Sequence, residues 1–293
     1  MILRIPPVRE RCVYKVRVVR FRSHIVRPLD AGNPWNRVIL VLTAVAGAVG
    51  ALLTLTLDRN LFLAVDAGGQ TFISWAVVRE LDPDRQVSAI FAAVVGGALA
   101  LVGVPTAILA FVGLLMTARI LVETTGRRPL VTDLAAMSVL ASGISFTSLG
   151  WVMGFGLAIS LYVDDRLAED HNRRALLAAI AGALGSSAVV TLSRALPESV
   201  PSVRPLLAAL VGLLALVAVA REPAHPISFV DSRSKRFLRR DRLHTGRAVC
   251  GLLIFAGTFV SGESVGAVVP MAVALAIALV SSEVERVKRW NTK

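Results

Sequence analysis

An aspartate inside a hydrophobic stretch is the first place to look for chemistry in this chain. Asp66 lies within the apolar run 61–78 and is followed closely by Gly68, Gly69 and Gln70. A charged side chain at membrane depth costs roughly 2.5 to 3.5 kcal/mol on insertion scales, so it usually faces protein or water and marks a functional site. A glycine pair can also open a helix and release backbone groups for binding. We therefore expect a proton, ion or substrate site here; the structural alternative is an Asp66 that is wetted or paired with a neighbouring helix.

Two groups of carboxylates and arginines stand between apolar runs and are predicted to lie on the same side of a membrane. Carboxylates at helix ends bind hard divalent cations, and arginines bind phosphate or diphosphate. Such a pairing suits an enzyme acting on a lipid-linked phosphate, whereas the structural alternative is a pair of solvated loops with self-neutralising charge. The metal-ligand candidates are Asp82, Asp84, Asp165 and Glu169. The phosphate-binding candidates are Arg79, Arg85 and Arg174.

The placement of these two groups resembles the UbiA-type membrane prenyltransferases. The segment Arg79-Glu80-Leu81-Asp82 with the following Asp84-Arg85 looks like the end of that family's first aspartate motif, and Asp165 with Glu169 looks like the second. The resemblance implies an all-helical enzyme with its aspartate motifs at the inner ends of the second and sixth helices, and it is the only interpretation that brings in Mg²⁺. At the positions of the family's leading Asn and Asp residues this chain has Ser74, Trp75 and Val78.

Composition places the chain in a membrane. Hydrophobic residues make up 55% of the 293 residues, mean hydropathy is +0.68, and the apolar residues form long blocks. Several blocks approach or reach the length that crosses roughly 30 Å of hydrocarbon as a helix. Because lipid offers no partner to unpaired backbone groups, we expect an all-α, polytopic transmembrane bundle of about ten spans.

The expected spans follow the apolar blocks. They are residues 38–57, 61–78, 88–102, 106–122, two helices within 134–163 divided near Ser148-Leu149-Gly150, 175–192, 206–220, 248–260 and 265–280. Four regions result: a basic N-terminal segment 1–36, a main bundle 37–220, a basic loop 221–247, and a C-terminal hairpin with a basic tail 248–293.

The charge distribution predicts the orientation. The formal net charge is +12, and the basic residues gather in segments between apolar blocks, so we attribute them to membrane topology rather than to nucleic-acid binding. The positive-inside rule then predicts two cytoplasmic termini in a multi-pass protein of a prokaryotic-type inner membrane. The expected partners are the bilayer and, at the basic loops, anionic lipids, with a second copy or another membrane protein left open. We expect no cleavable signal peptide at the N-terminus.

Three functions are compatible with these patterns. The first is a permease or flippase for a small or lipid-linked solute, with its site at Asp66 and the Gly68-Gly69 pair. The second is a lipid-phosphate enzyme of prenyltransferase type that uses the carboxylate groups. The third is a non-catalytic membrane scaffold whose basic loops contact lipid or a partner. No P-loop, GxSxG, HExxH or CxxC motif adds a further enzyme class, and Cys12 and Cys250 have no metal-type spacing.

Overall fold

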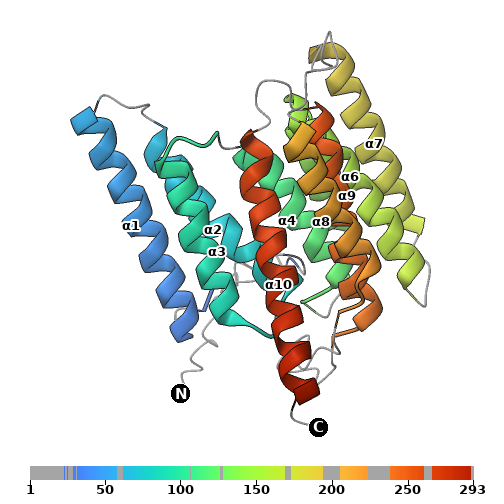
Figure 1. The fold of residues 1–293 in the computed structure, drawn as a ribbon. Helices are drawn as coiled ribbons and strands as arrows, with labels where there is room; N and C mark the ends of the chain where they lie inside the picture. Colours follow the sequence, from blue (N-terminus) through green and yellow to red (C-terminus); the bar gives the residue numbers. More distant parts are fainter. Residues whose placement is uncertain are drawn as a thin grey trace, which may run out of the picture.

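The computed structural model describes residues 23, 25, 29–30, 32–57, 62–105, 107–125, 128–168, 173–193, 205–223, 238–260 and 266–291. Within this part of the chain there are ten α-helices and no strand (Figure 1). The helices are α1 (Pro34–Leu57), α2 (Leu63–Leu81), α3 (Gln86–Leu101), α4 (Ile108–Val122), α5 (Val131–Ile144), α6 (Ser148–Leu167), α7 (Arg173–Ser193), α8 (Pro205–Ala220), α9 (Arg240–Val260) and α10 (Val269–Asn291).

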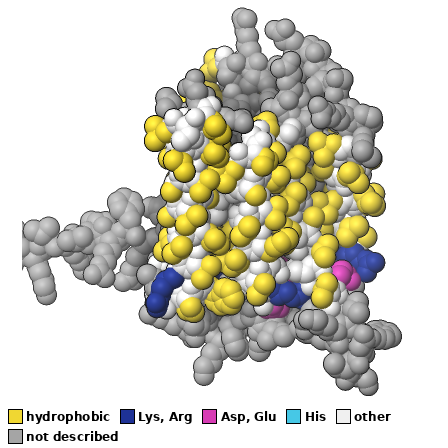
Figure 2. Space-filling view, turned by 60° about the vertical axis from the view of Figure 1, so that its left-hand side comes forward, with side chains coloured by type: hydrophobic (Ala, Val, Ile, Leu, Met, Phe, Trp, Pro, Cys, Tyr) yellow, Lys and Arg dark blue, Asp and Glu magenta, His cyan; other side chains and the backbone are white. Residues whose placement is uncertain are grey.

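Four helical segments in the described residues are long and apolar enough to cross a membrane. They are Pro34–Leu57, Arg173–Leu192, Arg240–Val260 and Gly266–Val284. Shorter apolar helices accompany them, and the molecule carries a belt of exposed hydrophobic side chains (Figure 2). On the face that Figure 2 shows, the charged side chains lie at the lower edge of this belt. An exposed apolar surface of this extent, together with four helices that could span a bilayer, is compatible with a protein in contact with lipid. The expected all-helical fold is confirmed for the described residues, and four of their helices are suited to cross a membrane.

Successive helices run in opposite directions through the bundle. Arg79, near the end of α2, donates a hydrogen bond to Asn36 at the start of α1, and Arg242, near the start of α9, donates one to the Leu121 carbonyl near the end of α4. Odd-numbered helices therefore begin, and even-numbered helices end, at the lower end of the bundle in Figure 1. We call this the charged end, because the ion pairs between helices lie there.

Helix α2 lies inside the bundle and contacts α1, α3, α4, α9 and α10. Most of its residues are buried, whereas α1 presents a mainly exposed apolar surface. On the other side of the molecule α5, α6 and α7 pack against one another, and α4 and α9 join this group to α2 (Figure 1). Asp66 and Gln70, which were singled out from the sequence, therefore belong to an interior helix.

Glycines set the distance between α2 and its neighbours. A Cβ atom at Gly50 of α1 would lie 2.8 Å from the Leu63 carbonyl oxygen, and one at Gly68 would lie 3.3 Å from the Thr43 carbonyl oxygen. At Gly69 it would lie 2.9 Å from Cδ1 of Ile108. Small residues allow this close approach of backbones in lipid. Helix α2 is continuous through Gly68-Gly69, so the glycine pair does not open the helix, and both glycines lie at contacts with neighbouring helices.

Several helix boundaries differ from the expected spans. The long block within 134–163 is divided at residues 145–147, just before the predicted position, and α6 begins at Ser148. Helix α9 already begins at Arg240, within the segment expected to be a loop, and α10 continues to Asn291 through the expected basic tail. Backbone hydrogen bonding does not stop where hydrophobicity stops, so a helix can extend beyond its apolar block. Most of the basic segment 1–36 and residues 224–237 lie outside the described residues.

Candidate functional site

Three polar residues of α2 form a stripe along the helix. Asp66, Gln70 and Ser74 are spaced by four residues and therefore share one face. Asp66 is half-buried, and its carboxylate has no hydrogen-bond or ion-pair partner in the described part of the chain. Gln70 and Ser74 are each only 1% exposed, and neither the amide nor the hydroxyl has a partner there. We call these three residues the polar stripe.

Gln70 and Ser74 of the polar stripe lack partners within the described part of the chain, in a place where polar groups normally have them. A buried polar group without a hydrogen bond costs about 1 to 3 kcal/mol, so native structures usually supply a water, an ion or a ligand. Gly96 of α3 faces the stripe, because a Cβ atom there would meet the Ser74 hydroxyl and would lie 3.1 Å from the Gln70 carbonyl oxygen. Thr43 of α1 and Thr117 of α4 also have buried hydroxyls without a partner among the described residues.

A cavity of about 410 Å³ lies between α2 and α4. Most of its wall is apolar, and the polar-stripe residues Asp66, Gln70 and Ser74 are not part of its lining. Charged side chains reach it from the charged end of both helices. Its lining consists of Leu29, Gly69, Phe72, Ile73, Trp75, Ala76, Arg79, Glu80, Val112, Leu115, Met116 and Arg119. This α2–α4 cavity is thus apolar over most of its lining and cationic in part of it.

The charged groups of the α2–α4 cavity offer mainly hydrogen-bond donors. Arg119 Nε lies 2.9 Å from one carboxylate oxygen of Glu80, and the Thr124 hydroxyl donates to the other. The Arg79 guanidinium lies 4.9 Å from the ring centre of Trp75, whose indole N–H has no acceptor among the described residues. Both oxygens of the carboxylate are therefore engaged. The lining also contains the Arg79 guanidinium, which donates to Asn36, and the Arg119 guanidinium that pairs with Glu80. This arrangement favours an anionic group.

Arg247 joins three helices at the charged end. Its side chain is 2% exposed, and Nε donates to the Leu81 carbonyl at 2.8 Å. One terminal nitrogen lies 3.3 Å from the Ser282 hydroxyl and the other lies 3.8 Å from an Asp82 carboxylate oxygen. Asp82 also accepts from the Ser281 hydroxyl and pairs with Arg85 at 3.5 Å. These contacts tie the end of α2 to α9 and α10.

A second buried arginine joins α9 to α4 and α6. Arg242 lies 2.6 Å from a carboxylate oxygen of Asp164 and 3.2 Å from one of Glu123, and its side chain is 4% exposed. Glu123 ends α4 in the left-handed conformation, with φ of 55°. A side chain other than glycine adopts this conformation at a cost of about 1 to 2 kcal/mol. The arrangement places the Glu123 carboxylate beside Arg242.

Burial dominates the titration of Asp82, which follows α2 in the loop before α3. Removal from solvent raises the pKa of its carboxyl above the usual 3.8. The Ser281 hydrogen bond and the charges of Arg85 and Arg247 act in the opposite direction, but more weakly. The carboxyl of Asp82 therefore binds a proton more readily than an exposed aspartate does.

The predicted metal ligands do not come together in the described residues. Asp82 contacts α9 and α10, whereas Asp165 lies at the end of α6 beside residues of the α4–α5 connection and α7. Asp84 and Arg174 are exposed, and Glu169 lies outside the described residues. Within the described part no group of three His, Cys, Asp or Glu side chains is placed to hold a metal ion. The described donor set does not fit Mg²⁺.

Three buried or half-buried arginines of this region were not among the candidate site residues predicted from the sequence. Arg119 is a charged residue inside the apolar run 106–122, which is the same signal that drew attention to Asp66. Arg242 and Arg247 fall on the helical face of α9 that also contains Cys250 and Ile254. Extending the helical period of the apolar run toward the N-terminus would have placed both arginines on the buried face.

Comparison with known proteins finds no match to this chain. No protein-family model, curated protein or solved structure matches this chain. The likeness to UbiA-type prenyltransferases is therefore limited to the two short segments named above, and the function is argued from the geometry of α2 and its neighbours.

Proposed function

We propose that this chain is a permease or flippase that moves a small or lipid-linked solute with an anionic group. In this proposal it crosses a cell inner membrane about ten times, with both termini in the cytoplasm. The observation that carries the proposal is the α2–α4 cavity, which combines an apolar wall with the guanidiniums of Arg79 and Arg119. An amphiphile with an anionic head matches both parts of such a cavity.

The polar stripe supplies the second part of the proposal. Asp66, Gln70 and Ser74 continue the polar character of α2 away from the charged end, along a helix in the interior of the bundle. Ionisable residues within membrane helices commonly line ion or proton paths in transporters. We assign Asp66 to a coupling proton or ion and Gln70 to the path of the polar group, with Arg79 and Arg119 at the entrance.

The enzyme alternative is less well supported. It needs Asp82 and Asp165 to share a metal ion, but Asp82 is engaged by arginines and a serine hydroxyl, and Asp165 belongs to another cluster. A scaffold needs neither a cavity nor unpartnered polar groups inside α2. Neither alternative therefore accounts for the α2–α4 cavity or for the unpartnered polar groups of α2.

The first test measures binding of monododecyl phosphate to the purified chain, followed by the change in tryptophan fluorescence. Arg79→Gln should weaken binding about tenfold, because a charge-assisted hydrogen bond contributes about 1.5 to 3 kcal/mol. Met116→Trp should weaken it by filling the cavity. Arg239→Gln is the matched control, since Arg239 is exposed and pairs with Asp241 outside the cavity. Equal effects of Arg79→Gln and Arg239→Gln would contradict the assignment of the cavity.

The second test separates binding from movement. In proteoliposomes containing a fluorescent lipid phosphate, the wild-type chain should speed the exposure of the inner-leaflet probe to dithionite. Asp66→Asn and Gln70→Leu should slow this step while monododecyl phosphate binding is retained. Binding that requires Mg²⁺ and is lost in Asp165→Asn would instead support the prenyltransferase-type enzyme.

A further inference from the structure

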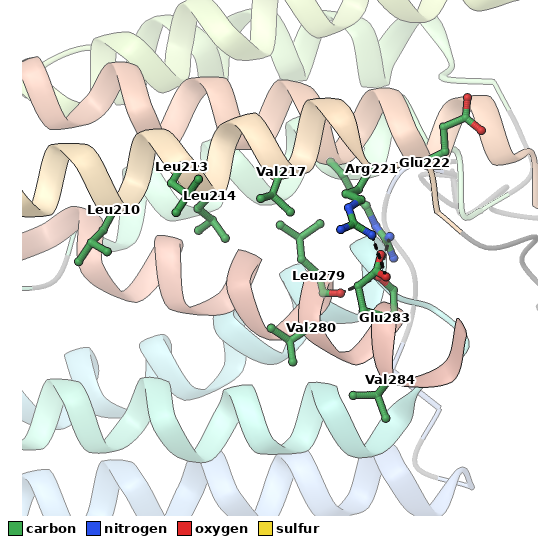
Figure 3. Close-up of a pocket in the computed structure, with 12 residues that line it drawn as sticks. Leu210, Leu213, Leu214, Val217, Arg221, Glu222, Leu279, Val280, Glu283 and Val284 are labelled. Carbon is green, nitrogen blue, oxygen red and sulfur yellow. Dashed lines mark hydrogen bonds and ion pairs between the residues drawn. The ribbon is translucent and has the colours of Figure 1, made fainter. Parts of the chain in front are cut away.

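A second concave site lies on the outer surface of the bundle, between α8 and α10. It is a groove of about 620 Å³. Leu214 and Val217 of α8 point toward α10, and Leu279 of α10 points toward α8 (Figure 3). Leu213 and Val280 at its edges are 60% and 63% exposed, so the groove is open on the side where lipid is expected. We call it the α8–α10 groove.

One end of the α8–α10 groove is polar. Arg221 follows the last residue of α8 and lies 3.4 Å from the Glu283 carboxylate of α10 (Figure 3). The Ser282 hydroxyl lies next to this pair and is itself held by Arg247. Both partners of the pair remain accessible, with side-chain exposures of 58% for Arg221 and 34% for Glu283. A positive and a negative group thus lie side by side, both partly exposed, at the charged end of the bundle.

We propose that the α8–α10 groove binds a bilayer phospholipid whose headgroup carries a phosphate and a primary ammonium, as phosphatidylethanolamine does. An acyl chain lies along the leucines and valines, the phosphate accepts hydrogen bonds from Arg221, and the ammonium donates to Glu283. This site is separate from the α2–α4 cavity and does not rest on the proposed transport function.

The charges at the polar end select this occupant over other lipids. An anionic headgroup places a second negative charge beside Glu283 without a compensating ammonium, which is unfavourable at this distance. A choline headgroup has a positive charge but no N–H group, so it cannot donate a hydrogen bond to the carboxylate. A phosphate with a primary ammonium complements both members of the Arg221 and Glu283 pair.

The neighbouring carboxylate of Glu222 provides a matched control. Glu222 directly follows Arg221, but its side chain points away from Glu283 and pairs with Arg240 at 2.7 Å (Figure 3). Glu222 also lines the groove, so Glu222→Gln removes the same charge as Glu283→Gln within the groove but outside the proposed headgroup contact. The pair of variants therefore separates a specific contact from a general effect of charge.

The test counts bound lipids by native mass spectrometry after the full-length chain is equilibrated with mixed micelles containing equal amounts of phosphatidylethanolamine, phosphatidylcholine and phosphatidylglycerol. The wild type should retain the ethanolamine lipid about tenfold over the other two, the ratio expected for one charge-assisted hydrogen bond. Glu283→Gln should remove this preference, whereas Glu222→Gln should keep it. Leu214→Trp should reduce retention by filling the groove. Retention without preference, preference for phosphatidylglycerol, or equal effects of the two glutamate variants would overturn the proposal.

A measurement on the wild type guards against variants that fail to fold. Phosphatidylethanolamine with a photoreactive diazirine in its acyl chain is added to the protein in nanodiscs, and the labelled peptides are mapped after irradiation. Labelling should concentrate on residues 210–217 and 279–284. Labelling spread evenly over the other lipid-facing helices would overturn the assignment of the groove.

Discussion

Arg247→Met is the substitution with the most clearly calculable effect on stability. Methionine has a similar length and no charge, so the apolar part of the side chain is retained while three polar contacts are lost. These are the contacts to the Leu81 carbonyl at 2.8 Å, the Ser282 hydroxyl at 3.3 Å and the Asp82 carboxylate at 3.8 Å. The Leu81 carbonyl and the buried Asp82 lose their arginine, and the end of α2 loses its link to α9.

The expected cost follows from these distances. A hydrogen bond from a charged donor contributes about 1.5 to 3 kcal/mol. Removing one member of a buried ion pair costs about 3 to 5 kcal/mol, because the remaining charge stays buried. The Asp82 contact is long and Arg85 still pairs with this carboxylate, so the two contributions do not add fully. We expect Arg247→Met to lower the free energy of unfolding by about 3 to 4 kcal/mol.

The assay is reversible unfolding of the purified chain in mixed micelles by sodium dodecyl sulfate, followed by circular dichroism. Arg221→Met is the matched control, because this arginine lies at the same end but is 58% exposed, and an exposed pair contributes about 0 to 1 kcal/mol. The double variant Arg247→Met/Asp82→Asn should be more stable than Arg247→Met alone, since it no longer buries an unmatched carboxylate. An Arg247→Met cost as small as the control, or strict additivity in the double variant, would refute the reasoning.

Two further predictions concern the loop after α2 and the contact between α1 and α2. Because burial raises the pKa of Asp82 above 3.8, the folded chain holds a proton at pH values where the unfolded chain has released it. The contribution of Asp82 to stability is therefore greatest below pH 3.8 and declines as pH rises through the raised pKa. Asp82→Asn should flatten this part of the plot of unfolding free energy against pH. An unchanged plot would argue against a raised pKa of Asp82. Gly50→Ala should cost about 1 to 3 kcal/mol, because its Cβ would lie 2.8 Å from the Leu63 carbonyl oxygen. Gly143→Ala, which meets nothing within 4 Å, should be neutral or stabilise α5 by up to about 1 kcal/mol, and thermal unfolding that failed to separate the two glycines would contradict the packing at Gly50.

The sequence predicted the class of the fold well and the polar contacts only in part. A long apolar block can satisfy its backbone hydrogen bonds in lipid by forming a helix, so the number and approximate positions of the helices followed from the apolar blocks. The partners of charged residues depend on which helices meet, and adjacent loops in the sequence do not reveal this. Asp82 and Asp165 looked like two halves of one site, yet Asp82 contacts Arg247 of α9 and Ser281 of α10. From the sequence, Arg247 was assigned to the basic loop and Ser281 to the C-terminal hairpin and tail, so neither was expected beside Asp82.

Asp66 and Gln70 could be singled out from the sequence without knowing which helices meet. Their polarity within an apolar run was enough to single them out, because the bilayer penalises such residues wherever the helix lies. The sequence did not reveal the function of Gly68 and Gly69, since a glycine pair favours a helix break and close packing equally. In the structure both glycines serve close packing, because backbone atoms of α1 and side-chain atoms of α4 occupy the space that a Cβ would need.

The contrast between α1 and α2 has a consequence for biogenesis. Helix α1 is among the segments apolar enough to cross a membrane, whereas α2, which carries Asp66, Gln70 and Arg79, is not. Helix α2 is therefore poorly suited to move from the translocon into the bilayer without another helix. Its close contact with α1 through Gly50 and Gly68 offers a route, in which the two helices partition into lipid as one hairpin. We expect α1 to act as the insertion partner of α2 during synthesis, before the remaining helices enclose it.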